Sequence, residues 1–285
     1  MMDGGHAVAL APPVAAPKPR ARISLKPLWA VLRVVAPIAS ILALWYLAIA
    51  VSGLPSFVIP RPERVLATLV EDRAFITVHL VSTLQVAALG LIFANVAGIG
   101  MALLFDAIPA TRHMLMPAAI TLRNMPYVAL VTVLSLALGD TLVSKVTVVA
   151  LAGFFPVLVN TMQGLRAADP VMLDRMRVLN AGWTTTFLHV RLPYAVPHVV
   201  AAQEIAATSA IIVAISAEWM ISSEGLGFII NRAMQTYRGD QVYAVALLAT
   251  LLSFALYAIV HQIGRRLDWR EAATRRKASP KENAA

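Results

Sequence analysis

Cysteine is absent from the 285 residues of the chain, and its absence excludes disulfides, thiolate metal sites and cysteine nucleophiles. Charged residues are also scarce, at 14% of the chain, where an ordinary soluble domain carries about 25%. Hydrophobic residues reach 59% instead. This balance indicates that lipid, rather than the interior of a large soluble domain, surrounds most of the chain.

The motifs of nucleotide-binding and metal-dependent enzymes are missing as well. There is no G-x-x-x-x-G-K-[ST], so ATP is not expected to bind this chain through a P-loop, and neither G-x-G-x-x-G after a strand nor H-E-x-x-H occurs. His189 and His198 fall on opposite sides of a helix with prolines between them, and we interpret the six histidines as structural or interfacial. Because no paired acids and no nucleophile with its base assemble, we predict no catalytic residue, metal or cofactor on this chain.

Basic residues are in excess, giving a net charge of +9. Such an excess can attract nucleic acid, but the lysines and arginines gather in the tails and one internal segment, so no nucleic-acid partner is expected. We predict a disordered basic tail at 1–30, a transmembrane domain at 31–265 and a basic tail at 266–285, with both tails in the cytoplasm. Ala48-Ile49-Ala50 has the spacing of a signal-peptide cleavage site, but the apolar run before it approaches spanning length, which favours an uncleaved first span.

Long apolar segments recur along the chain, and each can cross a bilayer as a helix because about 20 helical residues span the hydrocarbon core. They lie at 34–53, 78–105, 114–138, 142–164, 195–221 and 241–263. The third is broken at Asn124-Met125-Pro126, since proline removes a backbone donor and disfavours helix at the residue before it. Six spans put both termini on one side, and the basic tails put that side in the cytoplasm. The predicted fold is an all-α membrane protein with six transmembrane helices, N-in and C-in.

A stripe of small residues, Gly90, Ala94 and Gly98, runs along the second predicted span at four-residue spacing. Small residues in register let helix backbones approach closely. We favour packing within the chain over a dimer face as the use of this stripe.

Three ionisable side chains, Arg123, Glu204 and Glu218, lie within predicted spans, where each costs about 2.5–3.5 kcal/mol at a helix centre and must face protein or water. Glu204 and Glu218 are nearly four helical turns apart and share a face, with Thr208 beside it. We predict that these residues, with Arg123 and the broken helix at Pro126, form a translocation path. Structural pairing, for instance of Arg123 with Glu204, is an equal alternative, and Glu218 near the outer end is alternatively a gate residue.

The longest inner connection, about 166–193, joins the fourth and fifth predicted spans and is amphipathic. Asp169-Pro170 is typical of a helix start, and Asn180-Ala181-Gly182 of a helix end. A second short helix follows, in which Trp183 and Phe187 are apolar, and Leu192-Pro193 then returns the chain to the membrane. Two interpretations are open: a helix pair lying on the lipid surface, and a docking element for a soluble cytoplasmic partner.

This connection resembles the cytoplasmic signature loop of ABC-transporter permease subunits, in which E-A-A is followed after three residues by Gly and later by hydrophobic-x-Leu-Pro. Asp174-Arg175-Met176 falls where E-A-A belongs, and Asn180 stands for the Gly, a replacement that can hold a left-handed turn. Three more stretches resemble permeases of the nitrate/sulfonate/taurine import type: RNMPYVA at 123–129, AEWM at 217–220 and GLGFII at 225–230. Both alanines of E-A-A are lost, and the family's second proline near Thr132 and its W-F-G at 137–139 are missing.

The resemblance implies a permease in a bacterial inner membrane that works as a homodimer or as one of a pair. Its partners would be two ATP-binding subunits, which carry ATP and Mg²⁺, and an extracytoplasmic substrate-binding protein. The solute is expected to be small and anionic; nitrate, taurine, alkanesulfonates, a pyrimidine precursor and small aromatic acids are open. The residues expected to dock the ATPase are Asp174, Asn180, Ala181, Gly182, Trp183, Phe187, Leu192 and Pro193. The rival, a self-sufficient secondary transporter or channel, predicts matching broken helices in two halves, whereas only the third span is clearly broken.

Overall fold

The computed structural model describes residues 26–267, and the chain forms two units, Met1–Ser52 and Gly53–Ala285. The predicted tails at 1–30 and 266–285 fall almost entirely outside the described residues. The first unit contributes α1 (Lys26–Ser52), whose stretch Val35–Ser52 has a mean hydropathy of 2.0. That stretch is long and apolar enough to cross a membrane.

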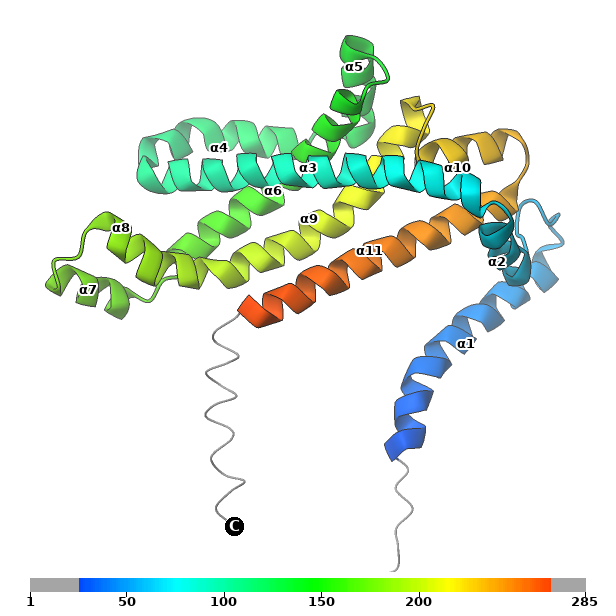
Figure 1. Cartoon of the computed structure of the whole chain (residues 1–285), viewed down its shortest axis with the longest axis horizontal. Helices are drawn as coiled ribbons and strands as arrows, with labels where there is room; N and C mark the ends of the chain where they lie inside the picture. The colour runs from blue at the N-terminus through cyan, green and yellow to red at the C-terminus, as the bar shows by residue number, and fades with distance from the viewer. Residues whose placement is uncertain (1–25, 268–285) are drawn as a thin grey trace, which may run out of the picture. The chain divides into compact units, whose positions relative to one another are not determined.

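The second unit is built from helices alone within the described residues (Figure 1). In chain order these are α2 (Pro62–Glu71), α3 (Arg73–Ala107), α4 (Pro109–Arg123), α5 (Tyr127–Leu138), α6 (Leu142–Arg166), α7 (Pro170–Val178), α8 (Trp183–Thr186), the π-helix η1 (Phe187–Arg191), α9 (Leu192–Ile221), α10 (Leu226–Gln235) and α11 (Gly239–Leu267). The prediction of an all-α membrane protein is therefore confirmed.

The predicted break in the third span is present. Helices α4 and α5 meet at a bend of 96° at Asn124–Pro126, and Pro126 is the residue that precedes α5. Five described helices are long and apolar enough to span a membrane, and there are six candidate spans if the bent pair counts as one. The six predicted spans correspond to these elements.

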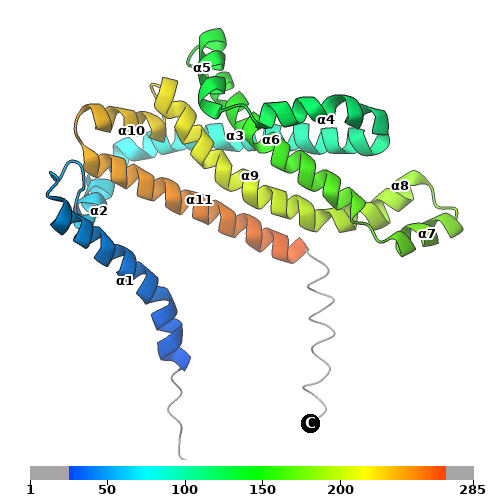
Figure 2. The same cartoon turned by 180° about the vertical axis from the view of Figure 1, so that it is seen from behind.

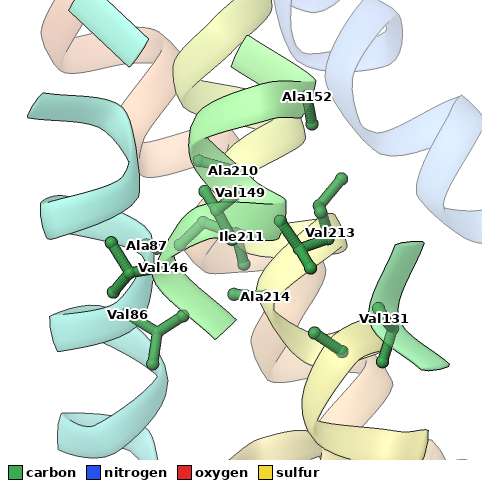
Figure 3. Close-up of a cluster of buried hydrophobic side chains, with 12 residues drawn as sticks. Val86, Ala87, Val131, Val146, Val149, Ala152, Ala210, Ile211, Val213 and Ala214 are labelled. Atoms are coloured by element: carbon green, nitrogen blue, oxygen red, sulfur yellow. The ribbon is translucent and has the colours of Figure 1, made fainter. Parts of the chain in front are cut away.

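The centre of the second unit is formed by α3, α6 and α9, with α5, α10 and α11 packed against α9. In both views α9 runs through the middle of the bundle, between α6 and α11 (Figures 1 and 2). Figure 3 shows the main buried cluster, in which small and β-branched side chains of α3, α5, α6 and α9 meet. Side chains of this size let the helices approach closely, which is how helices associate in lipid.

The small-residue stripe of α3 faces α6. A Cβ atom on Gly90 would collide with Val149, and one on Gly98 with Val157, while Ala94 is fully buried against Gly153. Packing within the chain, the favoured interpretation of the stripe, is therefore confirmed. The two glycines set the distance between α3 and α6.

Two of the connections between the predicted spans contain short helices. Helix α2 lies within 54–77 and buries Val65 and Thr68, and α10 lies within 222–240 and buries Leu226, Gly227, Ile229 and Ala233. Both helices are too short to span a bilayer. The pattern of span-length apolar segments therefore does not predict them.

Candidate functional site

The 166–193 loop begins as the sequence predicts. Asp169 caps α7 by accepting a hydrogen bond from the Val171 amide at 2.9 Å, and Pro170 occupies the first turn. Asn180 adopts a left-handed backbone with φ of 51°. The Ala181 amide donates to the Met176 carbonyl and the Asn180 amide to the Arg177 carbonyl, which is the Schellman arrangement that ends a helix. Asn180 thus performs the turn for which the resemblance expects glycine.

The second half of the loop differs from the prediction. Leu192-Pro193 does not turn the chain; α8, η1 and α9 form one continuous apolar helix, Trp183–Ile221. Pro193 lies inside this continuous helix, where its missing amide removes one hydrogen bond. The wider π-turn just before it, closed by a bond from the Leu192 amide to the Phe187 carbonyl, accommodates the proline. The loop is therefore joined rigidly to the following transmembrane helix.

The loop carries exposed apolar side chains. Val178 is 87% exposed, Leu179 74% and Trp183 60%, and the rings of Trp183 and Phe187 stack at 5.2 Å between centroids. Helix α7 has no buried residue. Contiguous exposed apolar groups rimmed by charged ones are typical of a surface that contacts a partner or a membrane. The exposed apolar surface therefore agrees with both interpretations of the loop, a helix pair on the lipid surface and a docking element for a cytoplasmic partner.

The predicted path residues do not form one cluster. Arg123 ends α4 beside the 96° break, with its guanidinium carbon 4.8 Å from the centre of the Phe155 ring. Glu204 lies on α9 and contacts Nδ1 of His261 on α11 at 2.9 Å, so the suggested pairing of Arg123 with Glu204 is wrong. Thr208 donates to the Glu204 carbonyl within α9.

Glu218 is fully buried, at the contact between α3, α9 and α10. Its Oε2 accepts hydrogen bonds from the Thr83 hydroxyl at 2.7 Å and the Gly227 amide at 3.1 Å. The Leu226 amide donates to Thr83, and the Gly225 amide donates to Nδ1 of His79. The carboxylate fills the space beside Gly225, whose φ of 98° suits glycine alone. Glu218 thus faces protein, as expected, and joins the 217–220 and 225–230 motifs.

His79 and Thr83 were not recognised as site residues in the sequence. The available signal is their spacing of one helical turn on an otherwise apolar face of α3. Their partners on α9 and α10 are more than a hundred residues away in the chain, so no local pattern reveals the contact.

A second polar contact joins α6 to the end of α9. The Lys145 ammonium, almost fully buried, donates to Asp140 at 3.0 Å and to the Ser222 hydroxyl at 2.9 Å, and the Ser223 amide donates to Asp140. Burial acts to raise the pKa of Asp140, but the hydrogen bonds from Lys145 and Ser223 and the Lys145 charge together lower it below its ordinary value. Asp140 is therefore ionised at neutral pH and holds Lys145 in place.

These features define a class: a helical membrane protein with a broken span, polar contacts between its helices and an exposed apolar loop. Residues 94–270 match the family described as binding-protein-dependent transport system inner membrane component. The chain belongs to this family. It is a multi-pass permease subunit of a bacterial ABC importer and is not itself the ATPase, which decides against the self-sufficient transporter.

Curated relatives match this chain over most of their own length. The chain is 28% identical to a probable ABC transporter permease protein of Haemophilus influenzae, covering 80% of this chain and 94% of the relative. It is 27% identical to the formylaminopyrimidine transport permease ThiX of Halalkalibacterium halodurans, covering 81% and 93%. It is 28% identical to the putative aliphatic sulfonates transport permease SsuC of Bacillus subtilis, covering 82% and 86%.

The fold is also found in solved structures. The MetNI methionine ABC transporter, solved in inward-facing conformations, matches with a TM-score of 0.61 and 16% identity over 67% of this chain and 95% of that one. At this identity the likeness shows a shared fold alone.

Proposed function

We propose that the 166–193 loop is the element through which a separate ATPase subunit drives this permease. The observation that carries the proposal is the exposed apolar surface of Val178, Leu179 and Trp183, on a loop whose second half, from Trp183 on, continues without a break into α9. Buried aromatic anchors dominate interface energies, and the stacked Trp183–Phe187 pair supplies a rigid one. A rigid connection lets force applied to the loop reach the spans.

The proposed assembly is a pair of permease chains, two ATP-binding subunits on the cytoplasmic face and an extracytoplasmic substrate-binding protein. Both termini lie in the cytoplasm, as the basic tails favour. The docking residues are Asp174, Asn180, Ala181, Gly182, Trp183, Phe187, Leu192 and Pro193. ATP-driven closure of the ATPase pair pushes the loop and alternates the access of the path between the two sides of the membrane.

The proposed solute is small and anionic, and Arg123 is its first contact in a path that also includes Pro126, Glu204, Thr208 and Glu218. Among the described residues Arg123 has no ion-pair partner, and it lies at the break of the bent span. A cation in that position attracts an anion entering the bundle. The sulfonate relative supports this class, while the formylaminopyrimidine relative shows that the same family also serves other solutes.

The experiment that tests docking places a charge on the proposed surface with Gly182→Glu. No atom lies within 4 Å of a Cβ at Gly182, and its φ is −64°, so the fold tolerates a side chain there. A carboxylate buried without a partner disfavours binding, and we expect co-purification with the ATPase to weaken about ten-fold, the effect of roughly 1.4 kcal/mol.

The matched control is Gly182→Ala, which adds bulk without charge and should bind the ATPase normally. If Gly182→Glu keeps normal ATPase association and uptake, the docking proposal is wrong and the lipid-surface interpretation stands.

A further inference from the structure

One ion pair fastens the 166–193 loop to a helix outside its own span. Arg191, the last residue of η1, donates to Oδ2 of Asp106 near the end of α3 at 2.6 Å. The Asp106 side chain is 15% exposed and that of Arg191 30%. Among the described residues, no other ion pair joins the segment 169–191 to another helix. Charges that are largely shielded from solvent interact strongly, which distinguishes this pair from the exposed Asp174–Arg177 pair within α7.

The surroundings of Arg191 fix this end of the loop while α7 stays exposed. Val190 is buried. Phe187 and Leu192 line an apolar groove of about 520 Å³ together with residues of α3, α6 and α11. The loop therefore has a free half, α7, and a seated half, η1. The π-turns belong to the seated half, and such turns are frequent at functional sites.

Asp106 lies at the corner where α3 turns into α4. The corner is tightly packed, because Phe105 is fully buried against Ala119 of α4 and Leu158 of α6. The Thr111 hydroxyl also donates a hydrogen bond to the Ile108 carbonyl. Helix α4 runs from this corner back along α3 to Arg123 at the 96° break (Figure 1). A displacement of Asp106 is therefore passed along α4 to the break.

We propose that the Asp106–Arg191 ion pair is the link that transmits movement of the 166–193 loop to the α3–α4 corner and through α4 to the break beside Arg123. The inference rests on the proposed function, because it supposes that an ATPase moves the loop. Through Leu192 the loop moves α9 directly; through Arg191 it also moves α3 and α4. Asp106 and Arg191 are positioning residues and contact neither ATP nor solute.

The test uses the complete complex of this chain with its ATPase subunits in lipid nanodiscs. Because the chain has no cysteine, Met125→Cys places its single thiol at the break, where Met125 is exposed. The rate at which N-ethylmaleimide modifies this chain is measured without nucleotide and with ATP plus vanadate. We expect ATP and vanadate to change the rate in the parent, because the break moves when the ATPase pair closes.

In the Met125→Cys parent, Asp106→Asn or Arg191→Gln should reduce the nucleotide-dependent change about five-fold or more, the lower end of ordinary coupling between sites, with the ATPase still bound. Exchanging the charges in Asp106→Arg with Arg191→Asp should restore it, which a general loss of fold would not allow. Glu71→Gln, which removes the exposed Arg64–Glu71 pair on α2, is the matched control and should respond like the parent.

An undiminished response in Asp106→Asn and Arg191→Gln would overturn the link. The link would also be overturned if the exchanged pair failed to restore the response. The same holds if ATP and vanadate did not change the modification rate of the Met125→Cys parent. Loss of the ATPase from the Asp106→Asn complex would also contradict it, because the pair would then belong to docking. If the parent itself fails to co-purify with an ATPase, the proposed function is wrong, and this inference fails with it.

Discussion

Helix α10 begins after Gly225, which has no side chain to cap it, and the first-turn amide of Gly227 donates to Glu218 on α9 instead. The first amides of a helix have no acceptor within the helix itself, and the Glu218 oxygen supplies one. The Thr83 hydroxyl on α3 donates to the same carboxylate oxygen. One buried residue thereby satisfies donors from two other helices, while its second oxygen, Oε1, has no hydrogen-bond partner among the described residues.

Glu218→Ala should lower the free energy of unfolding in detergent by about 1–3 kcal/mol, because the Gly227 amide is left buried without its acceptor. The Thr83 hydroxyl keeps the His79 carbonyl as an acceptor at 3.2 Å. Glu218→Gln should cost less, since its amide oxygen still accepts. The measurement is a denaturant titration of the purified chain. Glu224→Ala, at an exposed neighbouring position, is the control, and equal stability of the two alanine variants would show that Glu218 does not hold these helices.

Arg123 carries the proposed solute contact, and its guanidinium is held over the Phe155 ring, an arrangement that stabilises a cation. Arg123→Ala should abolish uptake of the transported anion, with nitrate, taurine and ethanesulfonate as probes in cells that express the whole transporter. Assembly with the ATPase should be retained. Uptake kinetics equal to those of the parent would remove Arg123 from the path.

At the scale of elements, α7 presents the docking surface only if the chain reverses at Asn180. A β-branched residue is strained at a φ of 51°, at a cost of roughly 1–2 kcal/mol. We therefore expect Asn180→Val to weaken ATPase association, as seen by co-purification, and Asn180→Gly to leave it unchanged. Equal association in both variants would mean that the turn at Asn180 does not set the docking surface.

How far the sequence predicts an element depends on how local its cause is. The start at Asp169, the turn at Asn180 and the break before Pro126 follow from residues within a few positions of each, and all three are present. The continuous helix through Leu192-Pro193 was missed because the π-turn that accommodates proline has no sequence signature. The contact of Glu218 with Thr83 was missed because it joins residues 135 positions apart.

At the scale of the whole second unit, α9 connects most of the other helices. About three turns into α9, Gln203 and Asn95 of α3 exchange amide hydrogen bonds, and Glu204 contacts His261 of α11. At its far end α9 is bound through Glu218 to α3 and α10. Held by polar contacts at these two levels, α9 can carry a push on the loop to its neighbours as a nearly rigid body, which suits a rocking mechanism.

The central claim is that the exposed surface of the 166–193 loop contacts the ATPase. The most direct measurement is photo-crosslinking from Leu179→Cys, labelled with a benzophenone maleimide in the assembled complex, with Leu136→Cys as the control. Each cysteine is the only one in its chain, and both positions are exposed, Leu179 on the loop and Leu136 on α5. We predict that the probe at 179 crosslinks to the ATPase subunit and the probe at 136 does not. Crosslinks from 179 to lipid alone would contradict the account.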